Sequence, residues 1–301
     1  MDYVILDMEW DSAYCPRAGK FVNQIIQIGA VKLDKDFKII DIFEETVCSS
    51  FSKKVSSRFA ELTGITTEMM LAGIPLETAV NKYNAWLGDG NVTMTWSNSD
   101  LFSIKENEHY LLKGVRFKID KYLDLQKFIQ NEMRFSGKEV NSQISLANAA
   151  SALDITTDEY SLHTAKDDSL VCAAMLKKCY NKERFDALVR DTSNPEFYKK
   201  LFFKAYYIDD IKSEYIDKKE LSFCCDRCGS KAEKLSPWRN SNHWFSAKFV
   251  CKSCKRKFIG KLSFRKMYDS VRVKRRVCEP KPKIKVTGEK TNEMQSVPEK
   301  V

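Results

Sequence analysis

The chain of 301 residues is 43% hydrophobic and 12% aromatic, enough for the core of one full-size domain and a smaller accessory one. It has no apolar run of membrane-spanning length and no signal peptide, so we expect a cytoplasmic protein without a membrane partner, whose ten cysteines are thiols or metal ligands rather than disulfides. Residues 221–301 hold 21 Lys and Arg against 7 Asp and Glu, whereas the preceding residues hold 29 against 34. This basic end favours a polyanionic partner, nucleic acid before membrane; a solvated tail is the alternative beyond Glu279.

The first half of the chain predicts strands followed by helices. Residues 3–6 are a continuous apolar run, which is typical of a strand buried on both faces. Two β-rich segments, 25–33 and 37–43, are separated by Asp34-Lys-Asp36, which predicts an antiparallel hairpin. The sequence then predicts helices near 58–72 and 77–87, a strand at 92–96 and a helix over 101–112.

The second half continues this alternation and then changes composition. Residues 122–125 fit a strand, and residues 145–153 and 165–180 fit helices. Strands followed by α/β alternation indicate an α/β fold with a mixed β-sheet flanked by helices. The predicted divisions are a first domain at 1–182, a charged helical connector at 183–220, a cysteine-bearing module at 221–268 and a basic, unstructured tail at 269–301.

Acidic residues stand at the ends of two predicted strands. Asp7 and Glu9 follow the first apolar run, and alternate residues of a strand project to the same side, so their carboxylates lie together. Asp100 follows the strand at 92–96. A solvated strand end and a helix cap at Ser99 or Asp100 are the ordinary alternatives. Carboxylates that converge from neighbouring strand ends are nevertheless suited to a pair of Mg²⁺ or Mn²⁺ ions.

The segment from His163 to Asp168 adds a histidine and a further carboxylate. Thr164 and Asp167 fit a capping box, so we expect a helix to begin near Ala165 and Asp167 to serve its start. Asp168, nearly one turn in, can face the metal site. His163 lies just outside the helix, and an imidazole that titrates near neutrality is suited to act as a general base. An ordinary surface histidine is the alternative.

These motifs, in this order, resemble the DEDDh family of ribonuclease-H-like 3′–5′ exonucleases. The matching residues are Asp7 and Glu9 in the first motif, Asp100 in the second, and His163 and Asp168, at the family's five-residue offset, in the third. The segment 24–33 also resembles the second strand of the family. The likeness covers about residues 2–180 and implies a ribonuclease-H-like fold.

The resemblance also implies a mechanism. The four acidic residues hold two Mg²⁺ (or Mn²⁺) ions, and His163 deprotonates the attacking water. The terminal nucleotide then leaves a single-stranded 3′ end as a 5′-monophosphate. The second motif, residues 95–100, is more similar to that of the histone-mRNA exonucleases and KapD-like proteins, which favours RNA over DNA.

Three further residues are candidates for substrate binding. Leu62 and Thr63 belong to a loop that resembles one lying beside the substrate end in relatives. Trp10 replaces the small residue that often follows the first motif. It either stacks on the terminal base or packs in the core.

Two Cys-x2-Cys pairs, separated by 22 residues, indicate a zinc ribbon. The predicted ligands of one structural Zn²⁺ are Cys225, Cys228, Cys251 and Cys254. Cys224 could compete with Cys225, but only Cys225 gives the two-residue gap. A redox pair is the weaker alternative.

Basic residues surround the second cysteine pair. The predicted contacts to nucleic acid are Lys252, Lys255, Arg256 and Lys257. They are interleaved with Phe249, Phe258 and Phe264, which suit base stacking. A surface that docks a protein partner is the alternative.

Together these features predict a metal-dependent 3′–5′ exonuclease for single-stranded nucleic acid, RNA in preference to DNA, with a zinc ribbon that holds the strand. A DNA exonuclease of the proofreading type is one alternative. A non-catalytic nucleic-acid-binding scaffold is the other, and the presence of all five active-site residues argues against it. The sequence does not indicate an oligomeric state.

Overall fold

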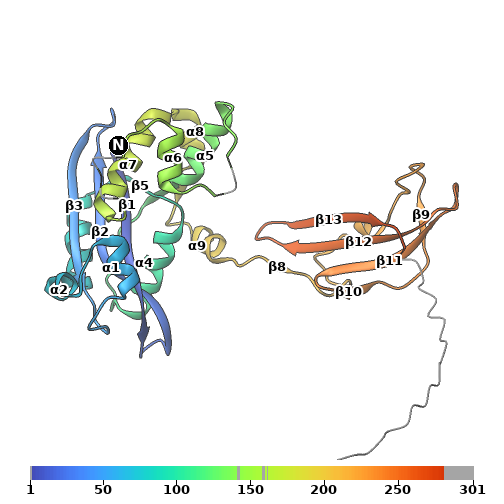
Figure 1. Ribbon diagram of the computed structural model, residues 1–301, viewed down its shortest axis with the longest axis horizontal. Coiled ribbons are helices and arrows are strands. Elements are labelled where there is room, and N and C mark those ends of the chain that lie inside the picture. Colours follow the sequence, from blue (N-terminus) through green and yellow to red (C-terminus); the bar gives the residue numbers. More distant parts are fainter. Residues whose placement is uncertain (1, 141–142, 158–159, 161, 281–301) are drawn as a thin grey trace, which may run out of the picture. The chain divides into compact units, whose positions relative to one another are not determined.

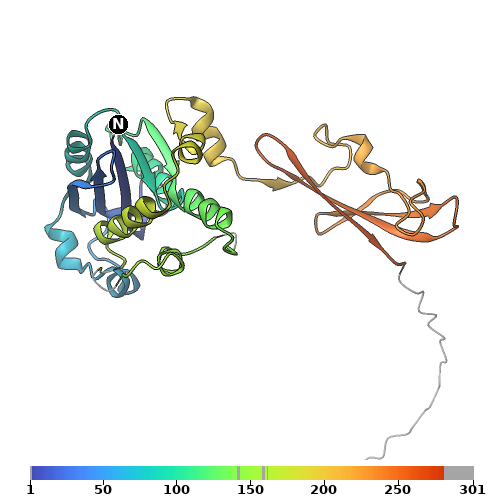
Figure 2. The ribbon, with the colours of Figure 1, turned by 90° about the horizontal axis from the view of Figure 1, so that it is seen from above.

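The chain divides into two compact units between Phe202 and Phe203. The computed structural model describes residues 2–140, 143–157, 160 and 162–280. The first unit is built on a seven-stranded sheet with helices around it, and the second on a six-stranded sheet (Figures 1 and 2). No helix within the described ranges is long and apolar enough to cross a bilayer.

The sheet of the first unit is mixed, as the sequence predicts, with the strand order β4-β3-β2-β1-β5-β6-β7. The strands are β1 (Tyr3–Cys15), β2 (Lys20–Leu33), β3 (Ile39–Cys48), β4 (Ile74–Pro75), β5 (Val92–Thr95), β6 (Lys121–Asp124) and β7 (Arg190–Asp191). The first three form an antiparallel meander, and β1, β5 and β6 are parallel. The ladder between β1 and β5 ends at Ile5 and Met94, whereas β1 continues to Cys15, so β1 extends well beyond the end of β5.

The helices of the first unit largely follow the predicted order. They are α1 (Ser57–Thr63), α2 (Thr67–Ala72), α3 (Leu76–Leu87), α4 (Ser99–Tyr110), α5 (Leu125–Phe135), α6 (Leu146–Ala152), α7 (Ala165–Cys179), α8 (Lys182–Leu188) and α9 (Pro195–Phe202). Gly64, with φ of 73°, ends α1, so the helix predicted over 58–72 is two helices. The sequence pattern does not predict α5, which begins where Asp124 accepts a hydrogen bond from the backbone of Lys127.

Alternate residues of β1 enter two cores on opposite faces of the sheet. Ile5 packs with α5, α6 and α7, whereas Leu6 packs with α3 and α4. Asp7 and Glu9 continue the alternation of Ile5. Their carboxylates therefore lie on the face that α7 covers.

The predicted helical connector at 183–220 is not a separate element. Phe185 of α8 is 1% exposed in the core of the first unit, and β7 pairs with β6. Beyond Phe203, the chain joins the second unit, where Ile208 and Ile216 are buried. The boundary falls near residue 202 because apolar side chains on either side of it complete two different cores.

The second unit begins before the predicted module and ends after it. Its elements are β8 (Tyr206–Tyr207), the 3₁₀ helix η1 (Lys218–Leu221), β9 (Ala232–Lys234), β10 (Arg239–Ser241), β11 (Trp244–Cys251), β12 (Lys257–Lys266) and β13 (Val271–Cys278). The prediction of an unstructured tail from 269 is wrong for β13, which pairs with β12 along its whole length. The rest of that tail, 281–301, lies outside the described residues.

Candidate active site and cysteine cluster

The first two carboxylates are held at the centre of the sheet by pairing between β1 and β2. Asp7 lies opposite Gly29, and Glu9 lies opposite Gln27. The register shifts directly after Glu9, so that β2 carries one extra residue there. Carboxylate oxygens of Asp7, Glu9 and Asp168 lie within 4.8 Å of one another.

Asp168 reaches this cluster because α7 begins in direct contact with β2. A Cβ atom added at Gly29 would lie 2.3 Å from the carbonyl carbon of Ala165 and 2.4 Å from the amide nitrogen of Lys166. Gln27 accepts a hydrogen bond from the amide of Ala165 at 3.1 Å. Only glycine permits this approach, so Gly29 and Gln27 together fix the first turn of α7 above Asp7 and Glu9.

The start of α7 also orders His163. The Thr164 hydroxyl accepts a hydrogen bond from the amide of Asp167 at 3.3 Å, so the helix begins at Ala165 as the capping pattern predicts. His163 has φ of 75°, and its amide donates to Oδ1 of Asp168 at 3.2 Å. Its side chain is exposed. Asp168 thus positions the backbone of His163, the candidate general base.

Asp100 belongs to α4, which packs on the face of the sheet opposite to α7. It is 2% exposed, and its Oδ1 accepts a hydrogen bond from the amide of Met8 at 3.1 Å. The β1–β5 ladder stops at Ile5 and Met94, so the carboxylate replaces a strand partner that β5 does not extend far enough to provide. Asp100 stands outside the 4.8 Å group of the other three acids.

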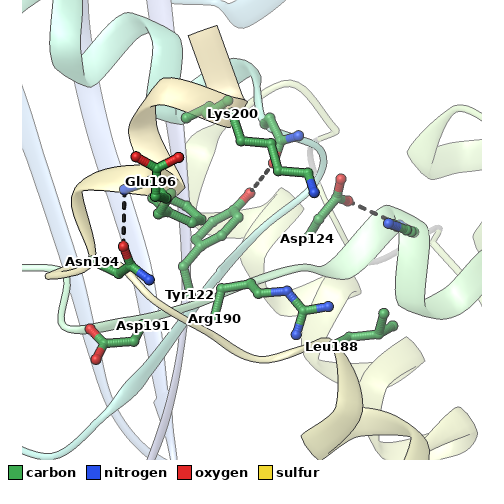
Figure 3. A pocket seen from close by; sticks show the side chains of 12 residues that line it. Tyr122, Asp124, Leu188, Arg190, Asp191, Asn194, Glu196 and Lys200 are labelled. Atoms are coloured by element: carbon green, nitrogen blue, oxygen red, sulfur yellow. Dashed lines mark hydrogen bonds between the residues drawn. The ribbon is translucent and has the colours of Figure 1, made fainter. Parts of the chain in front are cut away.

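Tyr122 of β6 supports the turn that leads to Asp100. Its hydroxyl donates to the carbonyl of Ser97 at 3.0 Å and contacts Oδ1 of Asn98 at 2.9 Å. Ser97 has φ of 78°, a conformation that this anchoring stabilises. Figure 3 shows Tyr122 beside a cavity of about 530 Å³ between β6, β7 and α9. None of the four site carboxylates lines this cavity.

The cluster is electrostatically strained without a cation. The pKa of Asp7 is raised well above its ordinary value, first by burial and then by Asp100, Asp168 and Glu9. Burial is also the main reason that the pKa of Glu9 rises to about 8 and that of Asp100 to about 7. The pKa of Asp168 is raised mainly by burial, although the amide of His163 lowers it.

Among the described residues, no lysine or arginine forms an ion pair with these carboxylates. The nearest candidate in sequence, Lys166, pairs instead with Glu44 at 3.2 Å. A set of hard oxygen donors, close together, partly buried and without a cationic partner, fits divalent metal ions such as Mg²⁺ or Mn²⁺. Asp7, Glu9, Asp168 and Asp100 are the residues that would hold them.

Comparison with known proteins identifies the first unit. The RNase T family model, described as an exonuclease, matches residues 4–176. The chain belongs to the RNase T exonuclease family. A search of curated proteins gives no match.

Solved exonuclease structures share a fold with about three fifths of this chain. Cell-death related nuclease 4 (CRN-4) has a TM-score of 0.50 and 22% identity, over 59% of this chain and 62% of that one. The nuclease domain of 3′hExo, a DEDDh family member bound to rAMP, has a TM-score of 0.50 and 22% identity. The match covers 59% of this chain and 90% of that domain. A 3′-exonuclease that recognises the histone mRNA stem-loop has a TM-score of 0.51 and 18% identity. The match covers 63% of this chain and 84% of that one. The chain thus matches less than two thirds of CRN-4.

The three candidate substrate residues differ in placement. Trp10 alternates with Glu9, packs against the α3–α4 core and lies on the face opposite to the carboxylates. Leu62 is 52% exposed on α1. Thr63 is buried, and its hydroxyl donates to the carbonyl of Phe59 at 2.9 Å.

One residue that the sequence analysis did not single out fastens α1 to the site strand. Asp11, on the same face of β1 as Glu9, accepts hydrogen bonds from the amide and hydroxyl of Ser56 at 2.6 and 2.8 Å. This contact holds the helix that carries Leu62 at the end of β1. Its only signal in the sequence is a third acidic residue in the alternation begun by Asp7 and Glu9.

The second unit brings its two cysteine pairs together. Sγ atoms lie 3.5 Å apart between Cys225 and Cys254 and 3.4 Å apart between Cys228 and Cys251. All four lie within 4.8 Å of one another. Cys224, by contrast, is exposed and outside this group. Four sulfur donors at such spacing fit one tetrahedral Zn²⁺.

The basic residues near the second cysteine pair are partly engaged within the unit. Arg256 pairs with Asp226 at 2.7 Å and with Glu279 at 2.5 Å, and Lys252 pairs with Glu233 at 3.3 Å. Lys255 and Lys257 are exposed. The expectation of base stacking here is wrong, because the three phenylalanines lie in the core. They are Phe249, Phe258 and Phe264, at most 2% exposed.

Gly29→Ala tests the contact between β2 and α7. We expect exonuclease activity to fall at least tenfold, because the added methyl group displaces Asp168 from Asp7 and Glu9. Activity is measured on a dinucleotide well below the melting temperature. Gly260→Ala, where a Cβ would meet Phe249 at 2.8 Å in the second unit, is the matched control and should keep that activity. Equal activity in the Gly29 variant would contradict this assignment.

Asp7→Asn tests the charge cluster through stability. In metal-depleted buffer we expect the melting temperature of the first unit to rise by about 2–4 °C, because one of several repelling carboxylates is removed. Added Mg²⁺ should raise the melting temperature of the parent protein but not that of the variant. Asp2→Asn, at an exposed acid before β1, should change neither value. A less stable Asp7 variant, with no Mg²⁺ effect on the parent, would count against the cluster.

Proposed function

We propose that this member of the RNase T exonuclease family is a metal-dependent 3′–5′ exonuclease that releases nucleoside 5′-monophosphates from single-stranded 3′ ends. The observation that carries the proposal is the convergence of Asp7, Glu9 and Asp168 within 4.8 Å, with Asp100 hydrogen-bonded beside them. These residues come from three distant parts of the chain. A chance cluster of surface acids would not be partly buried on the core-facing side of a sheet.

The site residues divide the chemistry between them. The acidic residues would hold two Mg²⁺ (or Mn²⁺) ions, and bound ions of this kind would polarise a phosphodiester and lower the pKa of water. Asp100 and Asp168 also bind backbone amides, at Met8 and His163, so their orientation is set before any ligand arrives.

His163 is the proposed general base. Its imidazole is exposed, whereas its backbone is fixed by the hydrogen bond to Asp168. The ring can therefore take a proton from the attacking water as that oxygen bonds to phosphorus. The 3′ oxygen of the preceding nucleotide leaves with the electron pair of the broken bond and is protonated by solvent.

We infer that RNA is the preferred substrate. The support is the second motif, in which Thr95 to Asp100 follow the pattern of the RNA-trimming branch of the family. The Leu62–Thr63 end of α1 is the proposed contact with the terminal nucleotide, since Leu62 is exposed on a helix tied to the site strand through Asp11.

We propose that the second unit is a zinc-ribbon module that holds the substrate strand. Its four cysteine thiolates would bind one Zn²⁺ with no open position, so this metal is structural. The residue after each cysteine pair, Gly229 and Lys255, has a positive φ of 72° and 60°. The two turns are thus built alike, as expected for two halves of one metal site.

The activity is tested with 5′-labelled single-stranded RNA and DNA of identical sequence. We expect Mg²⁺-dependent shortening from the 3′ end, with RNA degraded faster. Asp7→Asn and His163→Ala should each lower kcat by about 10² or more. His109→Ala, at an exposed histidine of α4, is the matched control and should keep full activity. Full activity of Asp7→Asn would refute the metal site, and equal rates would refute the RNA preference.

Zinc is tested by elemental analysis of the purified full chain. We expect about one Zn²⁺ per chain, lost in Cys228→Ser together with stability of the second unit, because metal binding contributes to its folding. Cys224, which is exposed and directly precedes the ligand Cys225, provides the control. Cys224→Ser should retain the metal. Retention by Cys228→Ser and loss by Cys224→Ser would overturn the ligand assignment.

A further inference from the structure

The sheet of the second unit has one apolar face and one basic face. Alternate residues such as Phe249, Leu262 and Val273 point into the core. The residues between them point the other way, across the strands β10 to β13 seen in Figure 1. The outward set, here called the basic face, includes Arg239, Lys248, Lys261, Arg272, Lys274 and Arg276.

Strand pairing aligns these cations into rows. Arg239 lies opposite Ser246, Ser246 opposite Lys261, and Lys261 opposite Arg276. One row therefore crosses four strands, on the order of 15 Å, and holds three positive charges. A row of this length matches an extended polyanion rather than a single small anion.

Like charges face each other directly at two positions of this surface. Lys261 is paired with Arg276, and Arg265 is paired with Arg272. Directly opposed like charges destabilise a sheet. In the described part of the chain, none of these four residues forms an ion pair, in contrast to Arg256 with its two acidic partners. The strands β10 to β13 themselves contain no acidic residue that could neutralise these charges.

Two arginines of this face lie against aromatic side chains. The guanidinium of Arg276 lies 4.8 Å from the ring centre of Trp244, and that of Arg265 lies 5.6 Å from Tyr207. Tyr207 also stacks on His243 at 4.5 Å. Such contacts order the guanidinium groups. They also occupy the rings, which favours contacts to phosphates over stacking of bases.

We propose that the basic face binds the phosphate backbone of a nucleic-acid strand. The charge complementarity comes from this unit alone, and the choice of nucleic acid as occupant rests on the proposed exonuclease function. The site thereby moves from Lys252 and Lys255, beside the second cysteine pair, to strands β10 to β13. It includes β13, for which the sequence predicts no structure. Binding through phosphates is independent of sequence and weakens steeply with salt.

The test uses the full chain with Lys261→Gln and Lys274→Gln combined. Neither side chain takes part in an ion pair or cation–π contact within the described residues, so no fold contact is lost. Binding of a labelled 30-nucleotide RNA is measured in metal-depleted buffer at several salt concentrations. We expect affinity to fall about tenfold at 0.1 M salt, and the slope of log K against log salt to fall by about 1.4. Lys218→Gln with Lys219→Gln, on η1, is the equal-charge control and should retain most of the affinity.

Hydrolysis of a dinucleotide, which tests the carboxylate site of the first unit, is measured in parallel. If the dinucleotide is not cleaved but the affinity difference holds, the proposed exonuclease function fails and the basic face stands. Equal RNA binding by the parent and the Lys261 and Lys274 variant, at unchanged melting temperature, overturns the basic face. Binding of phosphatidylserine vesicles with no binding of RNA also overturns it and assigns the surface to lipid headgroups.

Discussion

The contact between Gly29 and the first turn of α7 is the constraint on which the carboxylate cluster of the first unit depends. Asp7 and Glu9 come from β1, and Asp168 lies 159 residues after Glu9 in the chain. They meet only because a strand residue without a side chain lets the backbone of α7 rest on the sheet. Gln27 then binds the first amide of the helix. Two residues of β2 that carry no charge therefore decide where the last carboxylate sits.

The same contact explains why the site is costly to the folded protein. Packing α7 and α4 against β1 removes water from four carboxylates, and burial is the leading cause of every raised pKa in the cluster. Within the described residues no lysine or arginine pairs with them, and Lys166, the nearest in sequence, pairs with Glu44 instead. The negative potential of the cluster attracts divalent ions. Binding of such ions would offset the repulsion between the carboxylates and stabilise the folded unit.

Local patterns predicted the parts of the site that depend on neighbours in sequence. The alternation of Asp7 with Glu9 and the cap at Thr164 required only strand and helix geometry, and the structure confirms both. Trp10 shows the limit: its neighbours in sequence left both stacking and packing open, and its contact with the α3–α4 core became visible only in the structure. Arg256 shows it too, because its partners lie far away in sequence. The unpredicted β13 reads as a charged tail because every second residue of it points to solvent.

The second unit shows how a small domain can present such a charged strand. Among residues 203–280, the core of its sheet lies on one side, where Phe223, Phe249 and Phe258 pack together. A core of this size supplies little stability, and a metal bound by four cysteines can supply the remainder without using the other face. The outward face of the sheet then does not need to pack against other elements, so it can carry like charges next to one another. The proposed structural zinc and the proposed polyanion-binding surface are therefore both compatible with a sheet that has its core on one face.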